Sequence, residues 1–430
     1  MGLFTSTRHK HLPGFKELTK DTEIINLANS INKVYFPTLS PNGKPINYIV
    51  KENDHVKVGT LIGNRTDFEV PIYSSVSGTV LANETMYNPQ IGRNIPYLTI
   101  LSDNLFERDD LLPIVSLQSS KEEIFNAIKK AGLIGMGGAG FPTYVKYQNT
   151  KGVDTLLING VECEPFLTTD YVTMSTYPTL LLKGIELLLK ASEAKEAIIV
   201  IKVHKEKVKD AIEKELPNYK NIRIVEVEDL YPMGWERALI KRVLNREYDR
   251  LPIEASCIVN NAQTVIALAK TLLTGKTLAT KLITVSGDGI NKNANVLCRI
   301  GTLTTDIVNA LGGLIEGDVN LIPGGPMCSK AVNTTNFPIL MQMDALTILQ
   351  FKQHVALPCL RCGACTMHCP ASLQPVELKI AYERKDIDRM EKLKILSCVE
   401  CGMCSYVCPS SIEVTDTIKK AKMIYKLKHK

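Results

Sequence analysis

The chain has 430 residues, more than one hydrophobic core usually serves, so we expect several domains. Hydrophobic residues make up 45% of the chain and charged residues 22%, a globular balance that excludes a disordered or fibrous protein. The net charge of +6 is mild, and six lysines between Lys419 and Lys430 supply a large share of it. That short tail lacks aromatic stacking residues apart from Tyr425, so we expect no nucleic-acid partner.

The N-terminal ten residues are charged and lack the apolar stretch of a secretory signal. The sequence also lacks a run of about eighteen apolar residues that could span a bilayer. We therefore expect a cytoplasmic protein. Among the reduced thiols of that compartment, clustered cysteines bind metal more often than they form disulfides.

Short apolar runs broken by turn residues occupy positions 34–101 and predict a compact β domain, which we place at residues 1–105. The segments 56–63 and 74–80 resemble the two halves of the barrel-sandwich domain of biotinyl and lipoyl carriers. The lysine that carriers modify between those halves is missing here. We therefore expect a structural role for this domain rather than a carrier role.

Helical and strand patterns alternate from about residue 121 onward. We expect helices at 121–135, 179–192, 205–216, 235–247 and 262–273, and strands at 155–160, 197–203, 222–227 and 257–260. This alternation predicts a parallel sheet covered by helices, in a domain spanning residues 106–277. A further β segment at 281–289 begins a third unit, residues 278–330. A linker, residues 331–356, is expected to follow.

Eight of the twelve cysteines fall in two runs, each of the form C-x2-C-x2-C-x3-C-P. The first run contains Cys359, Cys362, Cys365 and Cys369, and the second contains Cys398, Cys401, Cys404 and Cys408. In this bacterial ferredoxin pattern the fourth cysteine of each run ligates the other cluster. The sequence therefore predicts two 4Fe-4S clusters in residues 357–430. One is bound by Cys359, Cys362, Cys365 and Cys408, and the other by Cys398, Cys401, Cys404 and Cys369.

Two structural zinc sites are the alternative, but zinc needs no third cysteine at this spacing. Between the runs, residues 377–396 have a helical period and indicate helices beside the cluster loops. The four remaining cysteines are expected to be small buried hydrophobes. They are Cys163, Cys257, Cys298 and Cys328.

A glycine-rich segment begins at Gly135, where Gly135, Gly137 and Gly140 fit G-x-G-x-x-G. The pattern is weak by itself, because it follows an amphipathic helix rather than a strand. Its exposed amides would suit a phosphate, with Lys146 adding charge. A simple tight turn is the alternative.

Polar turns follow two of the expected strands and precede one of the helices. They carry Asn159, Glu162 and Glu164; Asn260, Asn261 and Thr264; and Tyr231, Gly234, Trp235 and Glu236. Ligands in open α/β sheets bind near strand ends, although each turn could also be ordinary turn chemistry.

Taken in order, these fragments resemble the RnfC family, one of the subunit families of the Rnf ion-translocating electron-transport complex. Relatives are the flavin subunit of respiratory complex I and the electron-transfer protein of proline reductase. The resemblance runs from KELTKDTEI at Lys16 through NGVECEP, VNNAQT and GGPM to both cysteine runs. It implies a multidomain α/β and α+β chain with a barrel-sandwich domain, a Rossmann-like flavin domain, a β-grasp domain and a helical two-cluster ferredoxin domain.

The resemblance also implies FMN as a cofactor. The flavin would be lined by Gly135, Gly137, Gly138, Lys146, Asn159, Glu162, Tyr231, Asn260, Asn261 and Thr264. Phe141, Glu164 and Glu236 would lie toward a nicotinamide nucleotide, NAD. The implied activity is that of an NADH-dependent oxidoreductase subunit, which passes electrons from NADH through FMN and the two clusters to a partner.

The implied partners are other, membrane-embedded subunits of the complex and ferredoxin or another small redox protein. The implied location is the inner face of the cell membrane. Trp235 departs from the family pattern, because it could either stack on a flat ring or close the nicotinamide site. The alternative function is a soluble electron-carrying adaptor for an amino-acid reductase, without an NADH site of its own. The lysine tail is either a solvated helix or a docking element for a membrane-embedded partner or an anionic lipid surface.

Overall fold

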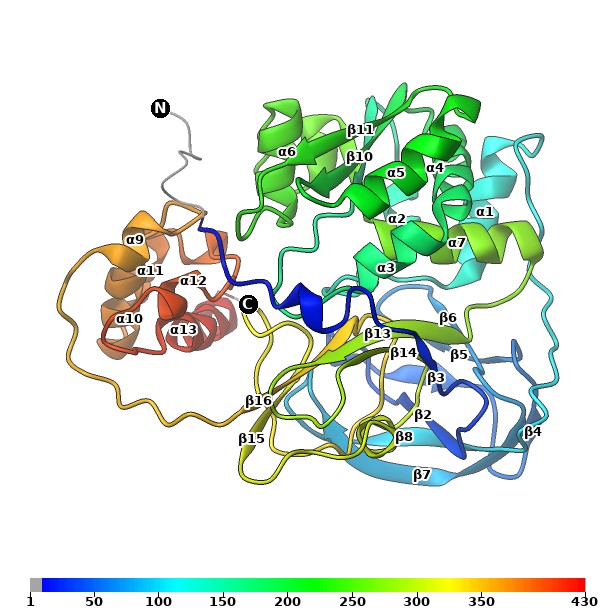
Figure 1. Ribbon diagram of the computed structural model, residues 1–430, viewed down its shortest axis with the longest axis horizontal. Helices are drawn as coiled ribbons and strands as arrows, with labels where there is room; N and C mark the ends of the chain where they lie inside the picture. The colour runs from blue at the N-terminus through cyan, green and yellow to red at the C-terminus, as the bar shows by residue number, and fades with distance from the viewer. Residues whose placement is uncertain (1–9, 430) are drawn as a thin grey trace.

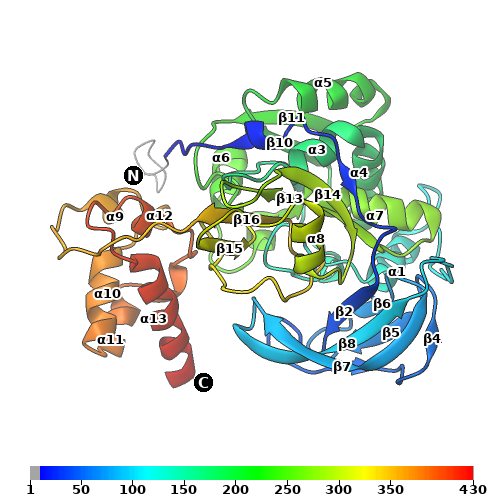
Figure 2. The ribbon, with the colours of Figure 1, turned by 60° about the horizontal axis from the view of Figure 1, so that its bottom comes forward.

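The computed structural model describes residues 10–429, which form three β-containing units and one helical unit (Figures 1 and 2). The charged segment before Lys10 and the last lysine of the tail, Lys430, lie outside these residues. Within residues 10–429, none of the helices combines the length and apolar character that crossing a bilayer requires.

The N-terminal unit consists of two small antiparallel sheets, as the short strand patterns predict. One has the strand order β2 (Lys33–Pro37), β8 (Arg93–Ser102), β7 (Gly78–Asn88) and β4 (His55–Val56). The other has the order β3 (Ile46–Tyr48), β5 (Leu61–Arg65) and β6 (Pro71–Tyr73). Val34, Ile62, Val80 and Ile100 are fully buried in one core that takes side chains from both sheets.

The second unit is an α/β domain with a four-stranded parallel sheet, also as predicted. The strand order is β11 (Ile222–Val227), β10 (Glu196–Lys202), β9 (Thr155–Asn159) and β12 (Cys257–Asn261). Its helices are α1 (Lys121–Ala131), α2 (Thr143–Gln148), α3 (Thr169–Thr176), α4 (Pro178–Ser192), α5 (Glu206–Glu215), α6 (Glu236–Leu244) and α7 (Ala262–Thr274).

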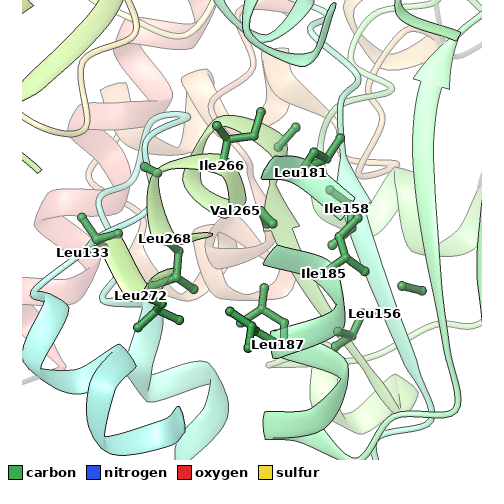
Figure 3. Packing of buried hydrophobic residues seen from close by; sticks show 14 of the residues in the cluster. Leu133, Leu156, Ile158, Leu181, Ile185, Leu187, Val265, Ile266, Leu268 and Leu272 are labelled. Carbon is green, nitrogen blue, oxygen red and sulfur yellow. The ribbon is translucent and has the colours of Figure 1, made fainter. Parts of the chain in front are cut away.

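Helices cover both faces of this sheet because side chains alternate along each strand. Leu156 and Ile158 of β9 pack against α4 and α7, as Figure 3 shows. Leu157, between them, points to the opposite face and joins Leu239 and Ile240 of α6. The sheet is therefore buried on both sides, and its strand ends are the free edges.

The third unit is a mixed five-stranded sheet with one helix, α8 (Thr304–Ala310). Its order is β1 (Ile25–Asn26), β14 (Ala294–Arg299), β13 (Thr280–Ser286), β16 (Ala345–Gln350) and β15 (Val319–Pro323). The expected linker, residues 331–356, is wrong in part. Its β16 pairs with both β13 and β15, and the preceding Phe337 is fully buried in the core of this sheet.

The C-terminal unit is helical, and an extended stretch after β16 leads to it (Figure 1). It contains α9 (Ala364–Met367), α10 (Pro375–Glu383), α11 (Ile387–Lys392), α12 (Met403–Tyr406) and α13 (Val414–Lys428). The two cysteine runs take the same turn, since Gly363 and Gly402 precede α9 and α12 with φ of 77° and 78°. Leu378, Met390 and Ile418 form the core on which both runs rest. Four 3-10 turns complete the chain: η1 (Lys16–Leu18), η2 (Leu216–Asn218), η3 (Pro252–Ala255) and η4 (Ile395–Ser397).

Candidate cofactor sites

The polar strand ends meet at the carboxyl edge of the α/β sheet. Asn159 ends β9, Asn261 ends β12, and the two residues are paired in the parallel register. The strand order reverses at this place, because β10 and β11 lie on the other side of β9. A crevice at such a switch point is where open α/β sheets usually bind their ligands.

The glycine segment is folded against this edge. Gly135 N–H donates to Phe141 O at 2.8 Å and closes the loop, and Met136 N–H donates to Thr264 Oγ1 at 3.0 Å. A Cβ atom on Gly137 would lie 3.1 Å from Asn261 Nδ2. Gly138 faces open space with φ of +129°. The loop therefore brings bare backbone to the switch point, as close approach of a phosphate requires.

Hydrogen bonds to other parts of the domain fix the amide side chains at this edge. Asn159 Nδ2 donates to Gly234 O at 2.9 Å, and Asn260 Nδ2 donates to the Tyr147 hydroxyl at 2.6 Å. Asn261 Oδ1 accepts the first-turn amide of Thr264 at 3.1 Å, so it caps α7. These asparagines are held before any ligand arrives, which lowers the ordering entropy that binding costs.

Lys146 lies beneath the same edge, where its Nζ donates to Val259 O at 2.6 Å. Burial lowers the pKa of Lys146, and the carboxylate of Glu236 offsets part of that effect. The structure thus brings Lys146 and Glu236 to one place, although they are 90 positions apart in the sequence.

The acidic turn after β9 contains a buried carboxylate oxygen. Glu162 Oε1 accepts the Asp170 amide at 3.0 Å, whereas Oε2 has no hydrogen-bond partner among the described residues. Lys16 Nζ lies 3.6 Å from that oxygen and donates to Glu164 O at 2.7 Å. Sequence reasoning missed the role of Lys16, because it precedes the turn by more than 140 positions and no local pattern connects them.

The three residues expected near a nicotinamide are each engaged elsewhere. Phe141 packs edge-to-face on Phe68 of the N-terminal unit, with ring centroids 5.8 Å apart. Glu164 accepts the amides of Met327 and Cys328 at 3.0 and 2.9 Å. Glu236 accepts the Tyr248 hydroxyl at 3.1 Å. Their assignment to the nucleotide stays a prediction.

Tyr231 connects the α/β unit to the helical unit. Its hydroxyl donates to Cys401 O at 2.6 Å and lies 3.3 Å from Cys328 Sγ. The ring is buried against Leu12 and Met403. Trp235, four residues on, is half-buried at the start of α6.

Four cysteines of the helical unit line one largely apolar cavity. They are Cys369, Cys398, Cys401 and Cys404, the set expected to bind the second cluster. Cys369 reaches it from the first run, as the crossed pattern requires. Burial raises the pKa of Cys404 to about 12, and the thiols of Cys398 and Cys369 add to the rise.

Hydrogen-bond donors already point at these sulfurs. Leu373 N–H donates to Cys369 Sγ at 3.3 Å, Glu400 N–H donates to Cys398 Sγ at 3.4 Å, and Thr415 Oγ1 lies 3.1 Å from Cys404 Sγ. Donors of this kind tune iron–sulfur potentials. Within residues 10–429 no three His, Cys, Asp or Glu side chains converge at single-ion distances. The thiols thus surround a space rather than a point, and the donor set fits a cluster.

The other cysteine set lies on the outer side of the helical unit. Cys359 and Cys362 are exposed, and Cys365 and Cys408 are half-buried. Leu357 N–H donates to Ser410 O at 2.9 Å, and Ser410 Oγ donates to Pro358 O at 3.0 Å. These bonds bring the chain before Cys359 beside the chain after Cys408, the two ends of the expected ligand set.

The expectation for the four remaining cysteines is half right. Cys257 and Cys298 are fully buried, but Cys163 is half-buried and Cys328 is exposed. Cys328 lies in the loop after β15 that Glu164 holds toward Tyr231, so its position serves a contact between units rather than a core.

Three family models match successive parts of the chain. Residues 6–104 match the RnfC barrel sandwich hybrid domain, residues 128–270 match the Nuo51 FMN-binding domain, and residues 355–412 match a 4Fe-4S dicluster domain. These are the N-terminal β unit, the α/β unit and the helical unit described above.

The RnfC-type subunit of the proton-translocating ferredoxin:NAD(+) oxidoreductase complex of Clostridium ljungdahlii is 32% identical to this chain. The match covers 83% of this chain and 80% of that protein. This chain belongs to the RnfC family. Another member, from the Na(+)-translocating ferredoxin:NAD(+) oxidoreductase complex of Acetobacterium woodii, is 31% identical over 89% of this chain and 88% of its own. The Rhodobacter capsulatus member is 31% identical over 90% of this chain and 76% of its own.

The fold of this RnfC homologue also recurs in a solved structure. A chain of an NAD+-reducing [NiFe]-hydrogenase superposes with a TM-score of 0.51 at 19% identity. The match covers 72% of this chain and 61% of the hydrogenase chain, so it spans less than two thirds of that protein. The likeness is one of fold.

Proposed function

We propose that this chain is the flavin- and cluster-bearing subunit of an Rnf-type ion-translocating oxidoreductase, and that it passes electrons between NADH and a partner. One observation carries the proposal. The glycine segment and the paired asparagines at the switch point lie in the same unit as Tyr231, and Tyr231 bonds to Cys401 in the wall of the four-cysteine cavity. Two redox sites in contact through one residue suit electron transfer.

The residues at the switch point fit FMN. Bare backbone at Gly138 and the amides of Gly135–Gly138 suit the phosphate, and the fixed amide groups of Asn159 and Asn261 suit polar groups of a flavin. The buried Oε2 of Glu162 is an acceptor still free for a hydroxyl donor. When bound, a flavin supplies exchange of electrons both in pairs and singly, whereas each cluster exchanges one.

We assign the cluster ligands as two crossed sets. Cys398, Cys401, Cys404 and Cys369 hold the cluster beside the α/β unit. Cys359, Cys362, Cys365 and Cys408 hold the outer one. Their shared cavity supports the first assignment, and the Ser410 bonds support the second.

The finer fold assignments follow from the topology. The parallel sheet with helices on both faces supports a Rossmann-like flavin domain at residues 106–277, and the mixed sheet with α8 supports a β-grasp domain. Because β16 belongs to that sheet, we extend the third domain from 278 to 350. The linker then reduces to about 351–356, before the ferredoxin-type domain at 357–430.

The nucleotide side is supported less directly. Glu236 lies with Lys146 at the switch point, and half-buried Trp235 precedes it. Family membership favours the Rnf-type role over a soluble adaptor for an amino-acid reductase, since the matched relatives are named as subunits of ferredoxin:NAD(+) oxidoreductase complexes. We therefore propose other complex subunits and ferredoxin as partners. The location that follows is peripheral, on the inner face of the membrane.

Cofactor content tests this function. Protein purified without oxygen and supplied with FMN should retain about one flavin and about eight iron per chain, as one flavin site and two cubane clusters require. Iron-loaded protein that does not bind FMN under reducing conditions would contradict the flavin half. Zinc in place of iron would contradict the cluster half.

A further inference from the structure

A cavity lies where the first three units meet, away from the carboxyl edge of the α/β sheet. Its walls come from β2, β5 and β6 of the N-terminal unit, the end of α1, and the segment just before β16. Its volume is about 100 Å³. Because a water-sized group needs roughly 10–15 Å³ of such volume, there is room for about seven to ten non-hydrogen atoms.

The walls of this junction cavity are mostly apolar. Phe36, Ile134, Ile300 and Leu340 line it, and each is less than 9% exposed. Apolar cavities of this size take up apolar molecules, because water finds too few polar partners in them. The walls alone would therefore select a small hydrocarbon-like body.

Arg65 is the charged side chain in the lining, and one of its nitrogens has no partner. Its Nε and Nη2 donate to Asp67 Oδ1 and Oδ2 at 2.9 and 2.7 Å, and both side chains are 7% exposed. The third nitrogen, Nη1, is buried and has no hydrogen-bond partner among the described residues. An unmade hydrogen bond on a buried guanidinium is costly, so a ligand that accepts from Nη1 would be stabilised.

The charge of Arg65 is already balanced. Burial alone would raise the pKa of Asp67, but hydrogen bonds from Arg65 and Asn42 outweigh it and hold that pKa below its usual range. The pair is therefore a neutral unit with one N–H to offer. A second carboxylate on Nη1 would bring an uncompensated charge into an apolar space, whereas a neutral carbonyl oxygen would not.

We propose that the junction cavity binds a small uncharged molecule, an apolar ring or chain with one carbonyl oxygen that accepts from Arg65 Nη1. The site borders the glycine segment, since a Cβ atom on Gly140 would lie 3.3 Å from Gln342 in the cavity wall. It is nevertheless separate from the flavin contacts, so its test does not depend on the flavin.

A matched pair of ligands tests both the place and the chemistry. Acetophenone and ethylbenzene have nearly the same size, but acetophenone alone carries a carbonyl. Their binding to the full-length protein is measured by equilibrium dialysis. We expect acetophenone to bind about tenfold more tightly, the worth of one hydrogen bond to a charged donor. Arg65→Lys, which keeps a charge beside Asp67, should abolish that preference.

A cavity-filling variant keeps the test independent of the Arg65 ion pair. Ala131 lines the cavity at the end of α1, so Ala131→Leu should reduce binding of both ligands at least tenfold. Asn126→Leu, on the exposed side of the same helix, should bind like wild type. Three outcomes would overturn the proposal: no binding of either ligand, equal binding of the two ligands, or unchanged binding by Ala131→Leu.

Discussion

The hydroxyl of Tyr231 lies 2.6 Å from the carbonyl oxygen of Cys401 and donates a hydrogen bond to it. Tyr231 belongs to the α/β unit and Cys401 to the four-cysteine cavity, so this bond crosses the boundary between the two candidate cofactor sites. The same boundary buries Leu12 and Met403. The second cysteine set therefore faces the α/β unit, while Cys359 and Cys362 remain exposed to a partner.

Removing that hydroxyl should loosen the boundary without unfolding either unit. Tyr231→Phe loses one buried hydrogen bond, worth about 1 kcal/mol or roughly a fivefold change in local opening. Hydrogen–deuterium exchange read by mass spectrometry should show faster exchange in peptides that span Cys401. Tyr177→Phe, at an exposed tyrosine, is the control and should leave those peptides unchanged.

The glycine segment gives a prediction that separates strain from ligand binding. Gly138 and Gly152 both have positive φ, +129° and +83°, and both face open space. Replacing either by alanine should therefore cost about 1–2 kcal/mol of stability from backbone strain. Only Gly138→Ala should also weaken FMN binding, which a fluorescence titration of the flavin measures. Equal flavin affinities in the two variants would remove Gly138 from the site.

Crossed ligation predicts which cluster each terminal cysteine serves. Cys369→Ser should impair the cluster beside the α/β unit, and Cys408→Ser should impair the outer one. Electron paramagnetic resonance of dithionite-reduced protein, with iron analysis, tells the two apart by their separate signals. If Cys369→Ser lost the same signal as Cys359→Ser, ligation would follow each run rather than cross between them.

A buried acidic group near the flavin site makes stability depend on pH. Burial, followed by the charges of Glu162 and Asp344, raises the pKa of Asp170 to about 8. The folded protein then holds a proton that the unfolded chain has lost above pH 3.8. The free energy of unfolding should therefore fall as pH rises toward 8, by no more than about 1 kcal/mol per unit.

Urea unfolding of flavin-free protein at pH 6 and pH 8 measures this effect. Asp170→Asn, which cannot ionise, should lose much of the fall in stability, whereas exposed Asp210→Asn on α5 should retain it. Parallel pH profiles for wild type and Asp170→Asn would show that Asp170 ionises normally.

Local patterns in the sequence predicted much of this molecule, for physical reasons. The cysteine spacing encodes a turn that each run forms by itself, and the alternation of apolar periods encodes the parallel sheet. Contacts between distant segments had no such signal. β16 is a strand because β13 and β15 flank it, and Lys16 reaches the acidic turn from another part of the chain.

Glu164 illustrates the same limit within the site. The sequence placed it at a strand end, where a ligand contact is a sound expectation. In the folded chain its carboxylate accepts two amides of the loop at Met327 and Cys328, which no spacing near Glu164 could reveal. A side chain's partner is decided by the loop that packs over it.

Trp235 and Glu236 decide how far the dehydrogenase account extends. If the nucleotide site is open, Glu236→Ala should slow reduction of the bound flavin by NADH through loss of a polar contact. If Trp235 closes the site, wild type should not respond to NADH, and Trp235→Gly should. Stopped-flow absorbance of FMN-loaded protein distinguishes the two cases, and a silent wild type with a responsive Trp235→Gly variant would favour the adaptor.

The central claim is that one chain carries electrons from a nicotinamide through a flavin to two clusters, and freeze-quench electron paramagnetic resonance tests it most directly. FMN-loaded, iron-replete full-length protein is mixed with NADH without oxygen, and the cluster signals are recorded with time. The account predicts that both signals grow as the flavin absorbance bleaches. Clusters that stay oxidised under NADH, yet are reduced by a reduced ferredoxin, would contradict it.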